Sequence, residues 1–183
     1  GGGITVPRIS SLYGPPSVYK STGIYDLIAN AQKLRESHPE VVGLASDGKP
    51  KYIVLVDPEK SMSPVHLKHC GVDITDQRFI VLDNFTDGDE AVDQIVDILE
   101  SGDAMLVCLD SLTTLMSRRE IDTDTKDLIK LQGWQGKFTS GIFKKIHNAN
   151  KGETAFVFVN QIRDTLGDKM NRAINDDTNY KPT

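Results

Sequence analysis

Short apolar runs alternate with amphipathic stretches along the 183 residues, and polar turns separate them. The runs are rich in Val, Ile, Leu, Phe and Tyr, which are residues that favour strands. Their continuous apolarity is typical of parallel strands covered on both faces. The pattern therefore predicts an α/β fold with a mostly parallel central sheet flanked by helices. The predicted strands are Ile9–Tyr13, Tyr52–Asp57, Phe79–Leu82, Ala104–Asp110 and Ala155–Asn160.

Four amphipathic stretches predict the helices that connect these strands. Their apolar residues recur every three or four positions, the spacing of one helix face. The fourth stretch carries a stripe predicted to pack on the sheet, which consists of Leu131, Trp134, Phe138, Ile142 and Ile146. Alternating strands and helices indicate one domain over residues 1–183. The predicted helices are Ser21–Arg35, Pro64–Cys70, Asp89–Ser101 and Lys126–Asn148.

Composition narrows the class of protein. Apolar residues make up 38% of the chain and charged residues 26%, as in ordinary globular domains. The longest apolar runs hold about six residues, whereas a membrane-spanning helix needs roughly 20. The first residues lack the pattern of a secretory signal, so we expect no membrane association and a cytoplasmic location, in the host cytoplasm if the protein is phage-encoded. Cys70 and Cys108 match no metal-ligand spacing and are predicted to be reduced core thiols.

Charge is distributed unevenly along the chain. The net charge is −5, but residues 1–111 hold 9 basic and 17 acidic residues, whereas residues 112–183 hold 12 basic and 9 acidic ones. A polyanion such as nucleic acid is therefore expected to contact the C-terminal part. A solvated surface of mixed charge would give the same asymmetry.

The first predicted strand leads directly into a glycine-started loop and a helix. The stretch Gly14–Thr22 reads GPPSVYKST, close to the phosphate-loop pattern G-x-x-x-x-G-K-[S/T]. In that pattern backbone amides wrap a phosphate chain, the lysine contacts the terminal phosphates, and the hydroxyl ligates Mg²⁺. The alternative is a turn with a surface lysine. The predicted loop residues are Gly14, Pro15, Pro16, Ser17, Val18, Tyr19, Lys20, Ser21 and Thr22.

Tyr19 occupies the position of the second glycine of that pattern. If φ is positive there, a tyrosine is strained by about 1–3 kcal/mol. If φ is negative, the ring is tolerated and lines the nucleotide. The sequence leaves both conformations open.

Acidic residues follow two of the predicted strands. Asp110 ends an apolar run and faces a loop, where a carboxylate can hold the Mg²⁺ shell. Asp57 and Glu59 end the second strand, and a carboxylate near the terminal phosphate can activate water. We select Glu59 for this role. The alternative is that both are exposed turn residues.

Several motifs in a fixed order resemble those of RecA-type recombinases. They are Val56-Asp57-Pro58-Glu59, Pro64, Cys70-Gly71-Val72-Asp73 and, most specifically, Asn160-Gln161-Ile162-Arg163. Leu12-Tyr13-Gly14-Pro15 and Leu109-Asp110-Ser111-Leu112 match in the same order. The resemblance covers nearly the whole chain and implies a RecA-like phosphate-loop NTPase core. An aromatic residue before the loop lysine is similar to phage recombinases of the UvsX kind.

The resemblance implies roles for individual residues. Lys20 and Ser21 would serve the phosphates of ATP and Mg²⁺, and Asp110 the water shell of Mg²⁺. Glu59 would be the catalytic base and Gln161 the sensor of the terminal phosphate. His66 lies where the family places an aromatic residue stacked on adenine, although a lone histidine is more often a surface or core residue.

Two stretches resemble the DNA-binding loops of the family, the first after Asp110 and the second from Arg163 onward. Leu166-Gly167 aligns with residues that wedge between base triplets. Four aspartates in the second stretch oppose phosphate binding, and each basic residue is alternatively a solvated side chain. The DNA-binding candidates are Arg118, Arg119, Arg163, Leu166, Gly167, Lys169 and Arg172, with Lys181 as a further cation.

The resemblance therefore implies a DNA-dependent ATPase that binds single-stranded DNA, pairs it with duplex DNA in strand exchange, and assembles into a helical filament in recombinational repair. The sequence ends within the second loop and begins near the first strand, so we expect a truncated core. Two alternatives remain: a hexameric helicase-type or clock-type ATPase on the same core, and a non-hydrolysing module that binds DNA or a recombinase.

Overall fold

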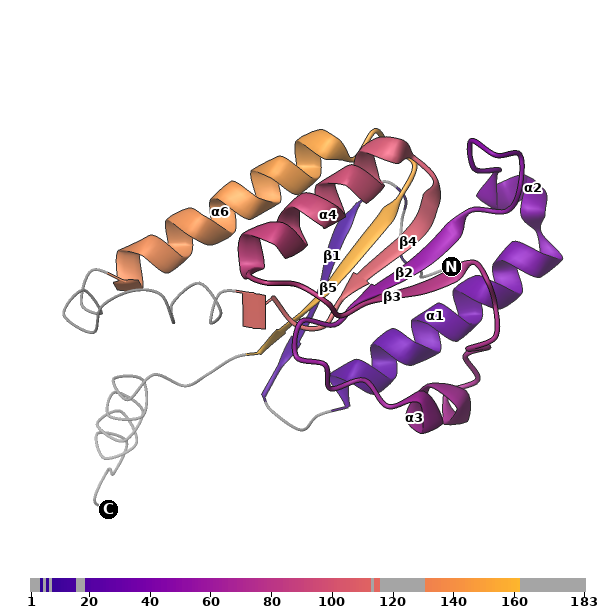
Figure 1. Cartoon of the computed structure of the whole chain (residues 1–183), viewed down its shortest axis with the longest axis horizontal. Coiled ribbons are helices and arrows are strands. Elements are labelled where there is room, and N and C mark those ends of the chain that lie inside the picture. Colours follow the sequence, from indigo (N-terminus) through magenta and orange to yellow (C-terminus); the bar gives the residue numbers. More distant parts are fainter. Residues whose placement is uncertain are drawn as a thin grey trace, which may run out of the picture.

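The sheet has five strands, all paired in parallel, in the order β1-β5-β4-β2-β3 (Figure 1). The structure is a computed structural model that describes residues 4, 6, 8–15, 19–112, 114, 115 and 131–161, with the side chains of 131–139 and 161 left out. Parallel pairing requires a crossover after each strand, which the helices provide. The strands are β1 (Ile9–Gly14), β2 (Tyr52–Val56), β3 (Phe79–Leu82), β4 (Ala104–Leu109) and β5 (Ala155–Gln161).

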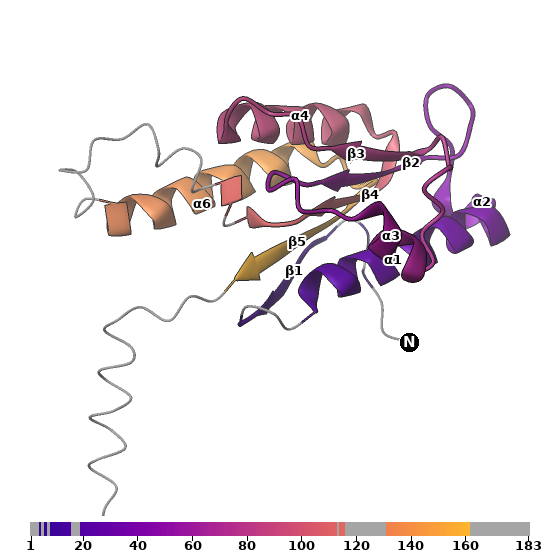
Figure 2. The same cartoon turned by 60° about the horizontal axis from the view of Figure 1, so that its bottom comes forward.

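Helices cover both faces of the sheet. In Figures 1 and 2, α1 and α3 lie on one face, and α4 and α6 lie together on the other. No helix in the described ranges is long and apolar enough to cross a bilayer. The helices are α1 (Lys20–Ser37), α2 (Pro39–Val42), α3 (Pro64–His69), α4 (Gly88–Ser101) and α6 (Leu131–Ala149).

The core consists of two apolar clusters, one on each side of the sheet. In β2, Val54 and Val56 join the cluster under α4 and α6, whereas Ile53 and Leu55 join the cluster under α1 and α3. This alternation follows from the two-residue period of a strand. Each fully buried Ile or Leu side chain contributes about 1.5–3 kcal/mol to stability. Because both faces of the strands are buried, the sheet is a rigid base for the loops at its ends.

The parallel register places the C-terminal ends of the strands along one edge of the sheet, which we name the carboxyl edge. Val56 of β2 lies opposite Leu109 of β4, so Asp57 and Asp110 follow neighbouring positions. The backbone amide of Asp110 donates to the carbonyl of Val56 at 2.9 Å, which extends the pairing by one residue. Gly14 of β1 lies opposite Gln161 of β5. The predicted loop, acids and glutamine therefore leave the sheet side by side.

The predicted elements agree closely with the observed ones. All five strands and their parallel pairing are confirmed, with ends shifted by no more than one residue. The helix predicted from Lys126 is described from Leu131 onward, and of its predicted apolar stripe Ile142 and Ile146 are buried. Helix α2 was not predicted, since only four residues form it.

The two cysteines are free thiols, as predicted. Cys108 is fully buried in β4, and burial raises the pKa of its thiol. Cys70 is only partly buried at the end of α3, so the prediction that both are core residues is wrong for Cys70.

Candidate functional site

A strand, a loop and a helix form the predicted phosphate loop. Strand β1 ends at Gly14 and α1 begins at Lys20. The Lys20 ammonium donates to the carbonyl oxygens of Gly14 at 3.1 Å and Pro15 at 2.6 Å. Pro16, Ser17 and Val18 lie outside the described residues. The first turn of α1 holds no acidic residue of its own, so the positive end of its dipole is available to an anion.

Tyr19, at the junction of loop and helix, has the left-handed conformation with φ 58° and ψ 27°. Its ring is 83% exposed, and its carbonyl accepts the amide of Gly23 at 3.0 Å, the first bond of α1. Of the two alternatives left by the sequence, the strained backbone is therefore the observed one. Tyr19 holds the conformation that glycine adopts without strain, at a cost of about 1–2 kcal/mol.

Ser21 and Asp110 join the helix start to the end of β4. The Ser21 side chain lies close enough to the Asp110 carboxylate to act on its pKa. Burial raises the pKa of Asp110, and repulsion from Asp57 and Glu59 adds to this, while Ser21 and Lys20 oppose it; the net shift is upward. A carboxylate in these surroundings gains from a nearby cation.

Asp57 stabilises the turn that follows β2. Its side chain is only 2% exposed, and its Oδ2 accepts the amide of Met62 at 2.7 Å. The hydroxyl of Ser61 donates to Oδ1 at 3.4 Å. The alternative that Asp57 is an exposed turn residue is therefore wrong. Both carboxylate oxygens of Asp57 therefore accept hydrogen bonds within this turn.

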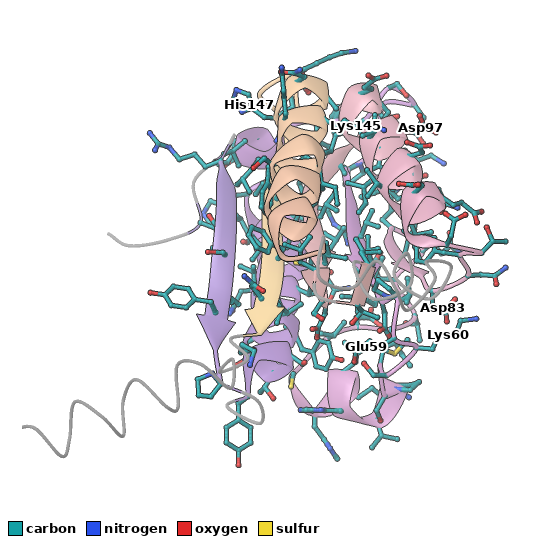
Figure 3. All side chains as sticks on the ribbon, turned by 90° about the vertical axis from the view of Figure 1, so that its left-hand side faces the viewer. Glu59, Lys60, Asp83, Asp97, Lys145 and His147 are labelled. Atoms are coloured by element: carbon teal, nitrogen blue, oxygen red, sulfur yellow. The ribbon has the colours of Figure 1, made fainter. Side chains whose placement is uncertain are left out.

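Glu59 lies exposed at the carboxyl edge, two residues beyond Asp57. Figure 3 shows Glu59 at the end of the molecule toward which the strand arrows point, together with Lys60 and Asp83. Its Oε1 accepts hydrogen bonds from the hydroxyls of Thr114 and Ser111, the latter at 3.5 Å. The side chain is thus exposed to solvent and held at one oxygen.

His66, on α3, is held beside the start of α1. Its Nε2 lies 3.3 Å from the Thr22 hydroxyl oxygen, and its ring meets the edge of the Tyr25 ring at 5.2 Å between centroids. His66 is exposed, so a flat ligand can reach its ring. Burial, followed by the charges of Asp110 and Asp57, raises the pKa of Tyr25 to about 12, so its phenol stays protonated near these carboxylates.

The structure brings most of the predicted nucleotide residues together. Gly14, Lys20, Ser21, Glu59 and Asp110 all lie at the carboxyl edge, with the backbone of Gln161 opposite Gly14. Sequence reasoning missed the contacts that Tyr25 and Thr114 make here, because their hydroxyls belong to no motif. The predicted DNA-binding residues lie outside the described part of the chain: Arg118, Arg119, Arg163, Leu166, Gly167, Lys169, Arg172 and Lys181.

The donor set fits Mg²⁺ bound together with phosphate. Within the described ranges, no three His, Cys, Asp or Glu side chains converge as a self-contained metal site. Mg²⁺ is commonly held by one or two protein oxygens, with phosphate oxygens and water completing its shell. Ser21 and Asp110 provide such a pair of oxygens, beside a lysine that can face phosphate.

Comparison with known proteins decides the family. The sequence matches the RecA N-terminal domain over residues 1–173. The chain belongs to the RecA family. It is 30% identical over 167 residues to Protein RecA of Streptomyces coelicolor, covering 91% of this chain and 39% of that protein. Over the same length it is 31% identical to Protein RecA of Fusobacterium nucleatum, again 91% of this chain and 39% of the relative.

RecA family membership agrees with the observed architecture, a parallel α/β core flanked by helices. Protein RecA of Herpetosiphon aurantiacus is 29% identical over 167 residues, which are 91% of this chain and 41% of the relative. The chain thus spans about two fifths of the length of these RecA relatives.

Proposed function

We propose that this chain is the ATP- and Mg²⁺-binding core of a RecA-family, DNA-dependent ATPase. The observation that carries the proposal is the meeting of Lys20, Ser21 and Asp110 at the carboxyl edge. Lysine, hydroxyl and carboxylate are the three side chains that phosphate-loop ATPases use for phosphate and metal. Family membership supports the same conclusion.

The hydrogen bonds of Lys20 indicate how its ammonium can bind phosphate. Its ammonium donates to two backbone carbonyls of the loop, and these are neutral acceptors. Phosphate oxygens carry charge and accept stronger hydrogen bonds from an ammonium. We therefore infer that Lys20 exchanges the carbonyls for phosphate when ATP binds. His66 would stack on adenine, since it is exposed and its ring is oriented by Thr22 and Tyr25.

Glu59 is the proposed general base. In hydrolysis, the oxygen of water bonds to the terminal phosphorus, the bond to the bridging oxygen breaks, and ADP leaves with that electron pair. The proton of the attacking water passes to the Glu59 carboxylate. Bound Mg²⁺ would neutralise phosphate charge, held by Ser21 and the water shell at Asp110. Gln161 would sense the terminal phosphate, in agreement with its backbone position opposite Gly14.

We further propose that the protein binds single-stranded DNA, assembles into a filament and promotes strand exchange with duplex DNA in the cytoplasm. The net positive charge of residues 112–183 supports a DNA contact there. The motif Asn160-Gln161-Ile162-Arg163 favours a recombinase over a hexameric helicase-type ATPase. The aromatic residue at position 19 supports a phosphate loop of the UvsX kind.

A non-hydrolysing module is the second candidate, because Tyr19 replaces a loop glycine. The 83% exposure of Tyr19 weakens that candidate, since its side chain is largely in contact with solvent. DNA-stimulated release of phosphate would exclude the module. DNA binding that is independent of nucleotide and unchanged by Lys20→Ala would favour it.

Equilibrium titration with ATP and Mg²⁺ tests the proposal directly. Lys20→Ala should abolish binding, whereas Lys33→Ala, an exposed lysine on the same helix, should not change it. Glu59→Gln should keep ATP binding but lower phosphate release about 10²–10⁴-fold, the usual contribution of a general base. Normal ATP affinity of the Lys20→Ala variant would overturn the assignment.

A further inference from the structure

Two hydroxyl side chains just after β4 contact the proposed base. The Thr114 hydroxyl donates to Oε1 of Glu59, and the Ser111 hydroxyl reaches the same oxygen at 3.5 Å. The two hydroxyl oxygens are also 3.0 Å apart. Because the single Thr114 proton is donated to Glu59, the shorter hydrogen bond of Ser111 is the one that it donates to Thr114. Glu59 and this hydroxyl pair lie 52 and 55 residues apart in sequence and meet only because β2 and β4 are neighbours.

The turn that carries Thr114 is anchored on three sides. Leu112 and Leu115, which flank it, are buried in the cluster under α4 and α6. The Thr114 amide donates to the Ser111 carbonyl at 3.3 Å. The Leu115 carbonyl oxygen packs so closely on Gly88 of α4 that a Cβ there would lie 2.5 Å from it. The hydroxyl of Thr114 is therefore presented from a rigid part of the fold.

Glu59 itself is exposed and sits on a turn, so among the described residues its side chain is held chiefly by hydrogen bonds. Both hydrogen bonds that it accepts from described residues fall on Oε1. These contacts hold the Oε1 end of the carboxylate, and among the described residues none donates a hydrogen bond to Oε2. A base must lie within hydrogen-bond reach of the proton that it removes, and a misplacement of about 1 Å can cost on the order of 10²-fold in rate.

We propose that Thr114, together with Ser111, is a positioning residue that orients the Glu59 carboxylate for catalysis. The inference rests on the proposed function, because it assigns a partner to the proposed base. Thr114 acts through Glu59, the side chain to which its hydroxyl donates. Its loss lowers turnover and leaves the affinity for ATP unchanged.

Thr114→Val tests this, because valine keeps the shape of threonine and removes the hydroxyl. We expect kcat for ATP hydrolysis to fall about 10–100-fold, with KM and the equilibrium affinity for ATP unchanged. Thr114→Ser keeps the donor and should restore kcat to near the wild-type value. Thr75→Val is the matched control: its hydroxyl donates to the Asp73 carboxylate at 2.6 Å, before β3 and away from the carboxyl edge. It should leave kcat unchanged.

The decisive comparison is made in the Glu59→Gln background. There Thr114→Val should add little further loss, because the base that it orients is already absent. An equal loss of turnover in both backgrounds, or wild-type turnover of Thr114→Val alone, would overturn the positioning role while leaving the ATPase assignment intact. If Thr114→Ser is as impaired as Thr114→Val, the role is structural and the proposal is also wrong. If the unaltered chain neither binds nor hydrolyses ATP, the proposed function itself fails, and this inference fails with it.

Discussion

Replacing Tyr19 by glycine should make the protein more stable, although it removes the largest side chain of the phosphate loop. The backbone of Tyr19 has φ 58°, which costs an L-residue about 1–2 kcal/mol. Glycine adopts this conformation without that cost but loses about 0.5–1 kcal/mol through its greater freedom in the unfolded chain. Because the ring is 83% exposed, its removal sacrifices little packing. The expected net gain is about 0.5–1 kcal/mol.

Thermal unfolding measures this gain. For a domain of this size, 1 kcal/mol corresponds to about 2–4 °C in Tm, so the Tyr19→Gly variant should melt about 1–4 °C higher. Tyr19→Ala is the matched control, because it removes the ring and keeps an L-residue at positive φ, and it should show no gain. Lys60→Gly should reproduce the gain at a second site, since Lys60 has φ 54°. A lower Tm for Tyr19→Gly, or an equal rise for Tyr19→Ala, would refute the backbone argument.

Two further substitutions test the packing and the electrostatics of the carboxyl edge. Gly88→Ala should destabilise the protein by about 1–3 kcal/mol, because the new Cβ would lie 2.5 Å from the Leu115 carbonyl oxygen; an unchanged midpoint of urea unfolding would contradict this. Asp110→Asn should stabilise the protein at neutral pH while weakening its Mg²⁺-dependent ATP binding. The folded state raises the pKa of Asp110 above its ordinary value of 3.8. Protonated Asp110 therefore stabilises the folded state, and this contribution is complete below pH 3.8. The contribution is lost as the pH rises through the raised pKa. The stability advantage of Asp110→Asn, measured by unfolding at several pH values without Mg²⁺, should therefore grow as pH rises from about 4 toward neutrality; a constant difference would show that Asp110 titrates normally.

The elements were predictable from sequence because their apolar residues follow a regular period. Strand β3 was located to the residue, since turns rich in polar residues bound its short apolar run. The positions of Lys20 and Asp110 in the fold were also predictable, because each stands at the end of an element, whereas their roles stay predictions. Helix α2 was missed because four residues carry no period.

Contacts between distant loops could not be predicted in the same way. Thr114 contacts Glu59 only through the pairing of β2 with β4, and a threonine near the end of a strand carries no signal of that contact. Tyr25 lies on a buried helix face, where the sequence predicts only an ordinary core residue. Its closeness to Asp57 and Asp110 depends on how the helix packs on the sheet. The conformation of Tyr19 was left open because both signs of φ were compatible with the motif.

The pairing of β1 with β5 also determines when the carboxyl edge can form while the protein is being synthesised. Residues from the two ends of the described fold, Gly14 and Gln161, are in register. A nascent chain on the ribosome carries its phosphate-loop residues early, but β5, the strand that pairs with β1 in the described sheet, emerges from the exit tunnel much later. Pairing over such a sequence distance is a slow step in folding. Under the proposed function, a partly synthesised chain therefore completes the carboxyl edge only when β5 has joined β1 to the rest of the described sheet.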